Sequence, residues 1–234
     1  MSIAAITFMQ NLPGRQLSDV DYMIIDFGAL GLQASVFRWK KSKELHCLSH
    51  AFTRELSGEK VDNILIDHFR SSVQAAWDKE KNESSSSSSR PAADEERFMQ
   101  STMQNLLKTV QQMKIQTGNT ADIVGAVTLV PFDEDAELKM IRTDFNALLR
   151  KEMENLIQNT LSSALLQATQ KSSNLNLRYV CWTGRASLLP LFQTIVKDFF
   201  NKRGMLFPFP LPYSRIFFVL SPLFSYSHFP SFIY

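Results

Sequence analysis

Residues 23–36, MIIDFGALGLQASV, decide the fold of this chain. The apolar residues 23–25 are followed by Asp26 and Phe27, and then by a turn over 28–31 that begins and ends with glycine. A second apolar run begins at Leu32. This pattern predicts a β-hairpin, since glycine tolerates the backbone of a tight turn. Such a turn can also aim backbone N–H groups at a phosphate, while the carboxylate holds a cation-bound water. A plain tight turn has the same composition, so the stretch alone leaves both interpretations open.

The segments around this hairpin alternate between strands and helices. Strands are predicted over 22–27, 32–39, 44–54, 123–130, 138–141 and 177–183, with the acidic residues 133–137 as a turn. Helices are predicted over 58–77, 95–113, 142–169 and 188–201, where apolar residues recur every three or four positions. The first three strands are close neighbours, which predicts an antiparallel meander. The whole order indicates an α/β fold, a mixed sheet with packed helices.

The composition is that of a globular protein. The chain has 234 residues, of which 44% are hydrophobic and 21% charged, with a formal net charge of +2. This balance lacks the basic excess of most nucleic-acid-binding proteins, so no nucleic-acid partner is predicted. The two cysteines, Cys47 and Cys181, lie too far apart for a disulfide framework or a zinc motif. Together with an N-terminus that lacks a basic residue before its apolar stretch, they predict a cytoplasmic protein.

Two segments differ from the rest in composition. Residues 79–97 contain six consecutive serines and many charges, which predicts a disordered surface insertion; a phosphorylation tract is the alternative. Residues 205–234 contain five of the nine prolines and seven of the eighteen phenylalanines. This aromatic tail is expected to lie outside the fold. A membrane anchor is the alternative, because 19 residues from Ile216 onward carry no Lys, Arg, Asp or Glu.

Several kinds of chemistry lack a matching motif in the sequence. The chain contains neither a Walker phosphate loop nor a Gly-x-Gly-x-x-Gly fingerprint after a strand, and the kinase-like tripeptide 26–28 has no accompanying kinase motifs. His46, Cys47, His50 and His68 resemble metal ligands. On a strand, however, Cys47 points away from His46 and His50, so no metal site is predicted. No catalytic residue is predicted.

Five segments resemble, in order, the second lobe of the nucleotide-binding domain of the 70-kDa heat-shock chaperone family. Residues 3–8 are similar to the helix between lobes, and residues 23–36 to the second phosphate motif, Asp-Leu-Gly-Gly-Gly-Thr-Phe-Asp-Val-Ser. Residues 56–63 are similar to the start of the smaller subdomain, and residues 141–145 lead into its long helix. Residues 180–201 are similar to the adenosine strand and helix. The resemblance implies an actin-like ATPase (ribonuclease H-like) lobe. It also implies three parts: a ribonuclease H-like subdomain at 1–57 and 141–204, a smaller inserted α+β subdomain at 58–140, and the tail at 205–234.

The resemblance also implies which positions face the nucleotide, namely Asp26, Gly28, Gly31, Lys108, Gly184 and Ser187. Several neighbouring positions depart from the family pattern. Ala29 and Leu30 stand where the family has glycines, so a Leu30 side chain projects where bare backbone should approach phosphate. Gln33 replaces the later aspartate, Arg185 replaces the second glycine of the adenosine strand, and Asn105 stands for the glutamate partner of the lysine.

The resemblance therefore predicts a divergent, truncated chaperone or co-chaperone of the stress response that binds ATP or ADP with Mg²⁺ at most weakly. It would assist protein folding through contacts with co-chaperones, unfolded clients or ribosome-associated factors, with no membrane contact unless the tail anchors. Hydrolysis by this chain is not expected, because phosphoryl transfer depends on holding phosphate and metal from both lobes. Two alternatives remain: a fragment of a full-length ATP-hydrolysing chaperone, and a non-catalytic module whose helices 58–77 and 142–169 bind partners.

Overall fold

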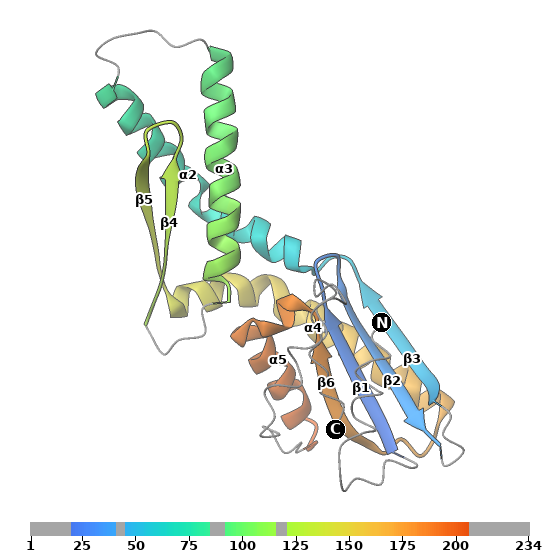
Figure 1. The fold of residues 1–234 in the computed structure, drawn as a ribbon. Coiled ribbons are helices and arrows are strands. Elements are labelled where there is room, and N and C mark those ends of the chain that lie inside the picture. Colours follow the sequence, from blue (N-terminus) through green and yellow to red (C-terminus); the bar gives the residue numbers. More distant parts are fainter. Residues whose placement is uncertain (1–19, 41–44, 85–91, 116–120, 206–234) are drawn as a thin grey trace, which may run out of the picture. The chain divides into compact units, whose positions relative to one another are not determined.

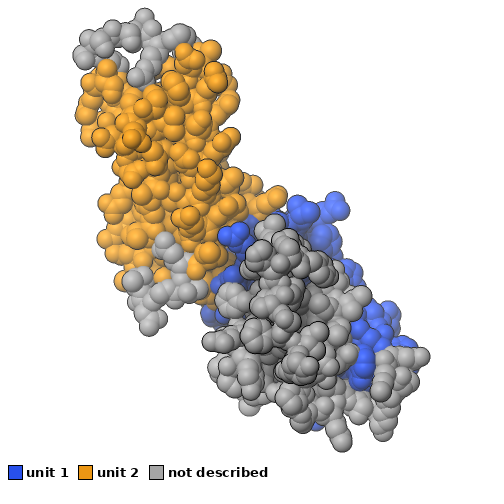
Figure 2. All heavy atoms as spheres, in the orientation of Figure 1, with its two compact units in different colours: residues 1–58, 153–188, 192–234 blue, residues 59–152, 189–191 orange. Residues whose placement is uncertain are grey.

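The computed structural model describes residues 20–40, 45–84, 92–115 and 121–205 (Figure 1). The chain divides into two compact units, coloured separately in Figure 2. Unit 1 comprises residues 1–58, 153–188 and 192–234, and unit 2 comprises residues 59–152 and 189–191. The helix expected at 3–8 and the tail from residue 206 onward lie outside the described residues.

Unit 1 contains a four-stranded mixed sheet. Its strands are β1 (Val20–Phe27), β2 (Leu32–Trp39), β3 (Leu45–Thr53) and β6 (Leu177–Thr183), arranged in the order β3-β2-β1-β6. The first three strands pair antiparallel with their neighbours in sequence, which confirms the predicted meander. Strand β6 pairs parallel to β1. The carboxyl ends of β1, β3 and β6 therefore lie at the same end of the sheet, beside the turn 28–31.

One face of this sheet forms the apolar core of unit 1. Met23, Ile25 and Phe27 alternate along β1 and are fully buried. The Phe27 ring lies 5.0 Å from the ring of Phe192 on helix α5 (Pro190–Asn201), so α5 packs on this face. Burial of each such side chain stabilises the fold by roughly 1.5–3 kcal/mol.

The same face carries a buried ion pair at the opposite end of the sheet from the turn. Asp21 is fully buried, and its two carboxylate oxygens accept hydrogen bonds from Nε and Nη2 of Arg38, each 2.7 Å long. Arg38 also donates to Ser172 Oγ (2.7 Å) and to the carbonyl oxygen of Asn174 (2.8 Å). The backbone N–H of Asn176 donates to Asp21 as well. This network joins β1 and β2 to the segment between α4 (Arg142–Lys171) and β6.

Unit 2 combines two helices with a β-hairpin. The elements are α2 (Gly58–Ser84), α3 (Ala92–Met113), and the antiparallel strands β4 (Asp122–Leu129) and β5 (Glu134–Ile141). The predicted apolar stripe of α2 is buried, at Val61, Leu65, Phe69 and Val73. Gly125 lets α3 approach β4 closely, since a Cβ there would lie 2.5 Å from Thr109 Cγ2. Thr109 also donates to the carbonyl oxygen of Ala126 (2.8 Å).

The acidic turn predicted at 133–137 is wrong, because β5 begins at Glu134. The reversal is the shorter segment 130–133, closed by hydrogen bonds from the N–H groups of Phe132 and Asp133 to the carbonyl oxygen of Leu129. Acidic residues are tolerated in β5 because its outward side faces solvent. Thr128, opposite Asp135 in the pairing, donates a hydrogen bond to its carboxylate (2.8 Å).

The disordered segment predicted at 79–97 is also too long. Residues 79–84 belong to α2 and residues 92–97 to α3, while 85–91 lie outside the described residues. A contact between the two helices stabilises both ends: Lys81 Nζ lies 2.7 Å from Glu95 Oε2 and 5.7 Å from the centroid of the Trp77 ring. Composition alone gives no sign of this pairing.

Helix α4 is the longest element, with 30 residues. Its buried positions include Phe145, Leu149, Met153 and Ile157, whereas Leu156 is only half-buried. Charged residues occupy other sides of its first half, at positions 142–154, whereas residues 155–170 contain none. Within the described part of the chain, no helix is both long and apolar enough to span a membrane.

The buried pair predicts a large loss of stability for Arg38→Met. The substitution leaves the Asp21 carboxylate buried without its cation, at a cost of about 3 kcal/mol in unfolding free energy. This is the low end for a broken buried pair, since Arg38 keeps 22% of its side chain exposed. Urea unfolding measures the loss. Arg70→Met is the matched control, because the Arg70–Asp67 pair is exposed and should contribute below about 1 kcal/mol. Equal losses would contradict the assignment.

The two thiols are predicted to react very differently. Cys47 is exposed, whereas burial raises the pKa of the Cys181 thiol to about 12. Since the thiolate is the nucleophile, very few Cys181 side chains are reactive at pH 8. Ellman's reagent should therefore titrate one thiol rapidly in the folded protein and the second only after denaturation. A Cys47→Ser variant that still reacts rapidly while folded would show that Cys181 is accessible.

Candidate functional site

The turn 28–31 is held in place by two backbone hydrogen bonds. The N–H of Gly28 donates to the carbonyl oxygen of Gly31 (3.0 Å). The carbonyl oxygen of Gly28 accepts from the N–H of Gly58 (2.8 Å), the first residue of α2. The hairpin and the start of α2 thus fix the turn from two directions. Ala29 and Leu30, at its tip, are exposed.

The glycines at the two ends of this turn differ in the space around them. A Cβ added to Gly28 would meet nothing closer than Asp26 Oδ1 at 3.9 Å and the carbonyl oxygen of Gly31 at 4.0 Å, which is ordinary van der Waals contact. A Cβ on Gly31 would lie 2.5 Å from the Phe52 ring and 2.7 Å from the carbonyl oxygen of Thr53. Gly28 therefore has room for a Cβ beside a carboxylate, while the lack of a side chain at Gly31 makes room for β3.

Gly184 lies against the end of β1. Its φ angle is +86°, and a Cβ there would collide with the carbonyl oxygen of Phe27 and lie 2.7 Å from Asp26 Oδ1. Ser187 is buried, and its hydroxyl donates to the carbonyl oxygen of Gly184 (2.7 Å) within the 3₁₀ helix η1 (Arg185–Leu188). The structure thus brings Gly184, Ser187 and Asp26 together. The hydroxyl of Ser187 is engaged by the protein itself.

The Asp26 carboxylate has a side-chain partner on the neighbouring strand. Asp26 is directly opposite Gln33 in the pairing of β1 with β2, and Gln33 Nε2 donates to Asp26 Oδ2 (2.9 Å). Asp26 is the only carboxylate within residues 26–33. The contact follows from the hairpin register, since opposite residues of an antiparallel pair share a face. The sequence shows the replacement at position 33 but not this hydrogen bond.

Lys108 belongs to unit 2, unlike the other five predicted site residues. It is exposed on α3, and Asn105, its expected partner position, donates instead to the carbonyl oxygen of Thr128 (3.1 Å). A lysine that the sequence did not single out is buried in this unit. Lys114 Nζ lies 2.5 Å from Asp62 Oδ1, and Gln111 donates to the other oxygen of that carboxylate. Lys114 thus has a structural anion as its partner.

A nucleotide with Mg²⁺ fits these residues only in part. Gly28 is the position at which a phosphate could approach the backbone beside Asp26, since an added Cβ there would meet only ordinary van der Waals contacts. Mg²⁺ prefers carboxylate oxygens and keeps several waters. Within residues 26–33 Asp26 is the single carboxylate, and one of its oxygens already accepts a hydrogen bond from an amide. The donor set therefore suits a phosphate better than it suits a divalent cation.

The histidines considered as metal ligands do not gather. His50 Nδ1 lies 2.8 Å from Ser35 Oγ, Cys47 Sγ donates to the carbonyl oxygen of Ser49, and His68 belongs to unit 2. Across residues 20–40, 45–84, 92–115 and 121–205, no three His, Cys, Asp or Glu side chains are grouped so that they could hold a metal ion.

The packing at Gly184 predicts that Gly184→Ala lowers the unfolding free energy by more than the strain of a positive φ angle accounts for. Gly204 is the matched control, because it also has a positive φ (+67°) but no atom within 4 Å of an added Cβ. Gly204→Ala should lose about 1 kcal/mol of unfolding free energy. Gly184→Ala should lose at least twice as much, because the methyl also displaces β1. Chemical denaturation compares the two variants. Equal losses would contradict the prediction, because they would mean that the end of β1 moves to accommodate the methyl group at no cost.

Comparison with known proteins adds the family. The family model described as Hsp70 protein matches residues 15–205, which is well over half of the 234 residues. A search of curated proteins found none that matches. The family model spans β1 through α5, and thus covers the turn 28–31, Gln33 and Gly184. The chain therefore belongs to the Hsp70 protein family.

Proposed function

We propose that this chain is a divergent Hsp70-family protein that binds ATP or ADP weakly and assists protein folding mainly through contacts with other proteins. Membership of the family supports a chaperone-type function and nucleotide binding in general terms. The family also implies an actin-like ATPase fold, and the mixed sheet with its helices is consistent with it. We assign the chain to the second lobe of that fold, with unit 1 as the ribonuclease H-like part and the unit 2 hairpin and helices as the smaller part.

The observation that carries this proposal is the state of the turn 28–31. Leu30 exposes 74% of its surface at a position where the resemblance places a glycine. Gly31 and Gly184 contact protein atoms closely, so their lack of a side chain is already explained by packing. Among these three, Gly28 is the family glycine whose added Cβ would meet only ordinary van der Waals contacts, beside Asp26. One such glycine can support weak binding of a phosphate, but it supplies few of the contacts that tight binding requires.

Efficient ATP hydrolysis is not part of the proposal. Phosphoryl transfer needs preorganised positive charge on the phosphates and a positioned water. Of the predicted site residues in unit 1, Asp26 is the one with an ionisable side chain, and it carries negative charge. The turn can therefore hold a nucleotide without stabilising the charge that develops during hydrolysis.

Contacts with other proteins are proposed to use exposed parts of the chain. The apolar stripe of α2 is core, since Val61, Leu65, Phe69 and Val73 are at most 5% exposed. If α2 binds a partner, as in the alternative of an interaction module, it uses its other, exposed side. We propose co-chaperones, unfolded clients or ribosome-associated proteins as partners, and the cytoplasm as the location.

Replacing Leu30 tests the proposal. Calorimetric titration of the whole chain with ADP and ATP is expected to give saturable binding with a Kd weaker than about 10 μM, equivalent to about −7 kcal/mol. Leu30→Gly should tighten binding, because the bare backbone can approach a phosphate. Leu30→Ala is the matched variant, which removes the isobutyl group but keeps a Cβ, and should bind with intermediate affinity.

Three results would contradict the proposal. Absence of nucleotide binding in both the parent and Leu30→Gly would leave the turn a purely structural element. Equal affinities for the parent, Leu30→Ala and Leu30→Gly would place the nucleotide elsewhere. Steady ATP turnover by the purified chain at a rate typical of an enzyme, about 1 per second or faster, would show that hydrolysis survives.

A further inference from the structure

The Gln33 side chain points its amide nitrogen at the carboxylate of Asp26. The donor Nε2 lies 2.9 Å from Asp26 Oδ2, and both side chains are partly buried at the end of the β1–β2 hairpin. The orientation of the amide follows from chemistry, because an ionised carboxylate accepts hydrogen bonds and cannot donate them. The amide oxygen of Gln33 therefore faces away from the Asp26 oxygen to which the amide is bonded.

Both oxygens of Asp26 have near neighbours. Oδ2 accepts the hydrogen bond from Gln33. Oδ1 lies next to the backbone of Gly184, where even a methyl group would come within 2.7 Å of it. A divalent cation that coordinates Oδ2 directly would compete with the amide for that oxygen. It would also meet the single negative charge of Asp26, in place of the two that an aspartate at position 33 would provide. Mg²⁺ gives up its waters reluctantly and needs near-octahedral geometry, so this exchange is unfavourable.

We infer that Gln33 makes ligand binding at the turn 28–31 independent of divalent cations, so that a nucleotide phosphate binds there without the protein holding a metal ion. The identity of the ligand in this inference rests on the proposed function. The exclusion of the metal is argued separately, from the contact between Asp26 and Gln33. Gln33 is thus a residue that determines specificity, and it is not catalytic.

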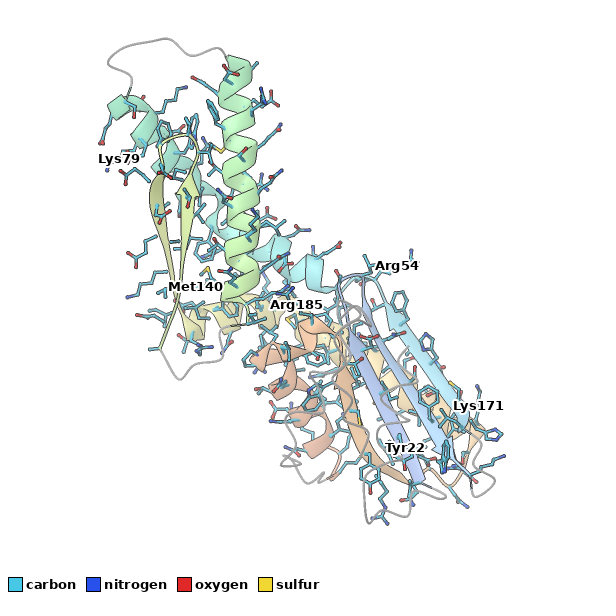
Figure 3. All side chains as sticks on the ribbon, viewed as in Figure 1. Tyr22, Arg54, Lys79, Met140, Lys171 and Arg185 are labelled. Atoms are coloured by element: carbon cyan, nitrogen blue, oxygen red, sulfur yellow. The ribbon has the colours of Figure 1, made fainter. Side chains whose placement is uncertain are left out.

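Side chains can supply the positive charge that a cation would bring. Arg54 and Arg185 both lie at the end of the sheet that carries the turn (Figure 3). The Arg54 guanidinium lies 5.9 Å from the centroid of the Phe52 ring, and that ring covers Gly31. Arg185 follows Gly184 directly. Both arginines are exposed, so their attraction for a phosphate is screened by salt.

Metal binding can be measured directly on the whole chain with Mn²⁺. The electron paramagnetic resonance signal of free Mn²⁺ falls when the ion binds to protein. The parent chain should show no saturable site in the submillimolar range, whereas Gln33→Asp should gain one, with an affinity at least about tenfold higher. Gln33→Asn is the matched control, since it has the same length as Gln33→Asp but no charge. Circular dichroism and thermal unfolding of each variant confirm that it is folded.

Calorimetric titration with ADP and ATP, in EDTA and in excess Mg²⁺, completes the test. The parent and Gln33→Asn should bind each nucleotide with affinities that agree within about twofold in the two conditions, and Gln33→Asp should bind more tightly with Mg²⁺, by about tenfold. Saturable Mn²⁺ binding by the parent, Mg²⁺-dependent nucleotide binding by the parent, or no gain of metal binding in folded Gln33→Asp would each overturn the inference. If no variant binds nucleotide but Gln33→Asp alone binds Mn²⁺, the proposed ligand is wrong and the metal exclusion by Gln33 stands.

Discussion

The close approach of Gly184 to the end of β1 is the constraint on which the site depends. At this point the parallel strands β1 and β6 end together, and the backbone of Gly184 leaves no room for a side chain beside Phe27 and Asp26. The contact fixes the Asp26 carboxylate against the backbone and places it next to Gly28. The position of the turn follows from the same contact, because Gly28 is also tied to the first residue of α2. The contacts that pack the end of the sheet therefore also set the geometry of the site.

Glycines of the same motif serve different purposes in this chain. Neighbouring protein atoms require a glycine at Gly31 and at Gly184, whereas packing would accommodate a Cβ at Gly28. A scaffold can therefore keep its glycines after its ligand contacts have weakened, because packing alone penalises their replacement. Leu30 and Gln33 lie where packing imposes no such demand: Leu30 is mostly exposed, and Gln33 is half-buried. The ligand-binding properties of the turn can change at these positions while the sheet stays intact.

Much of the fold could be predicted from the sequence, because its signals are local. Apolar runs on either side of a glycine turn predict β1 and β2, and four-residue spacing predicts the buried stripe of α2. The extent of β5 could not be predicted, since its acidic residues face solvent in a strand as readily as in a turn. The ends of α2 and α3 depend on the contact of Lys81 with Glu95, 14 residues away. The hydrogen bond between Gln33 and Asp26 follows from the register, whereas the difference between Gly28 and the two packed glycines requires three-dimensional contacts.

The central claim is that nucleotide, in the absence of metal, contacts this chain at Gly28 beside Asp26. The most direct measurement is a titration of the ¹⁵N-labelled chain with ADP in EDTA, followed by amide chemical shifts. The account predicts saturable shifts that are largest for Gly28 and Ala29 and extend to Gly184, with the buried pair of Asp21 and Arg38 unaffected. An amide resonance of Gly28 that does not move while resonances elsewhere in the chain shift would contradict it.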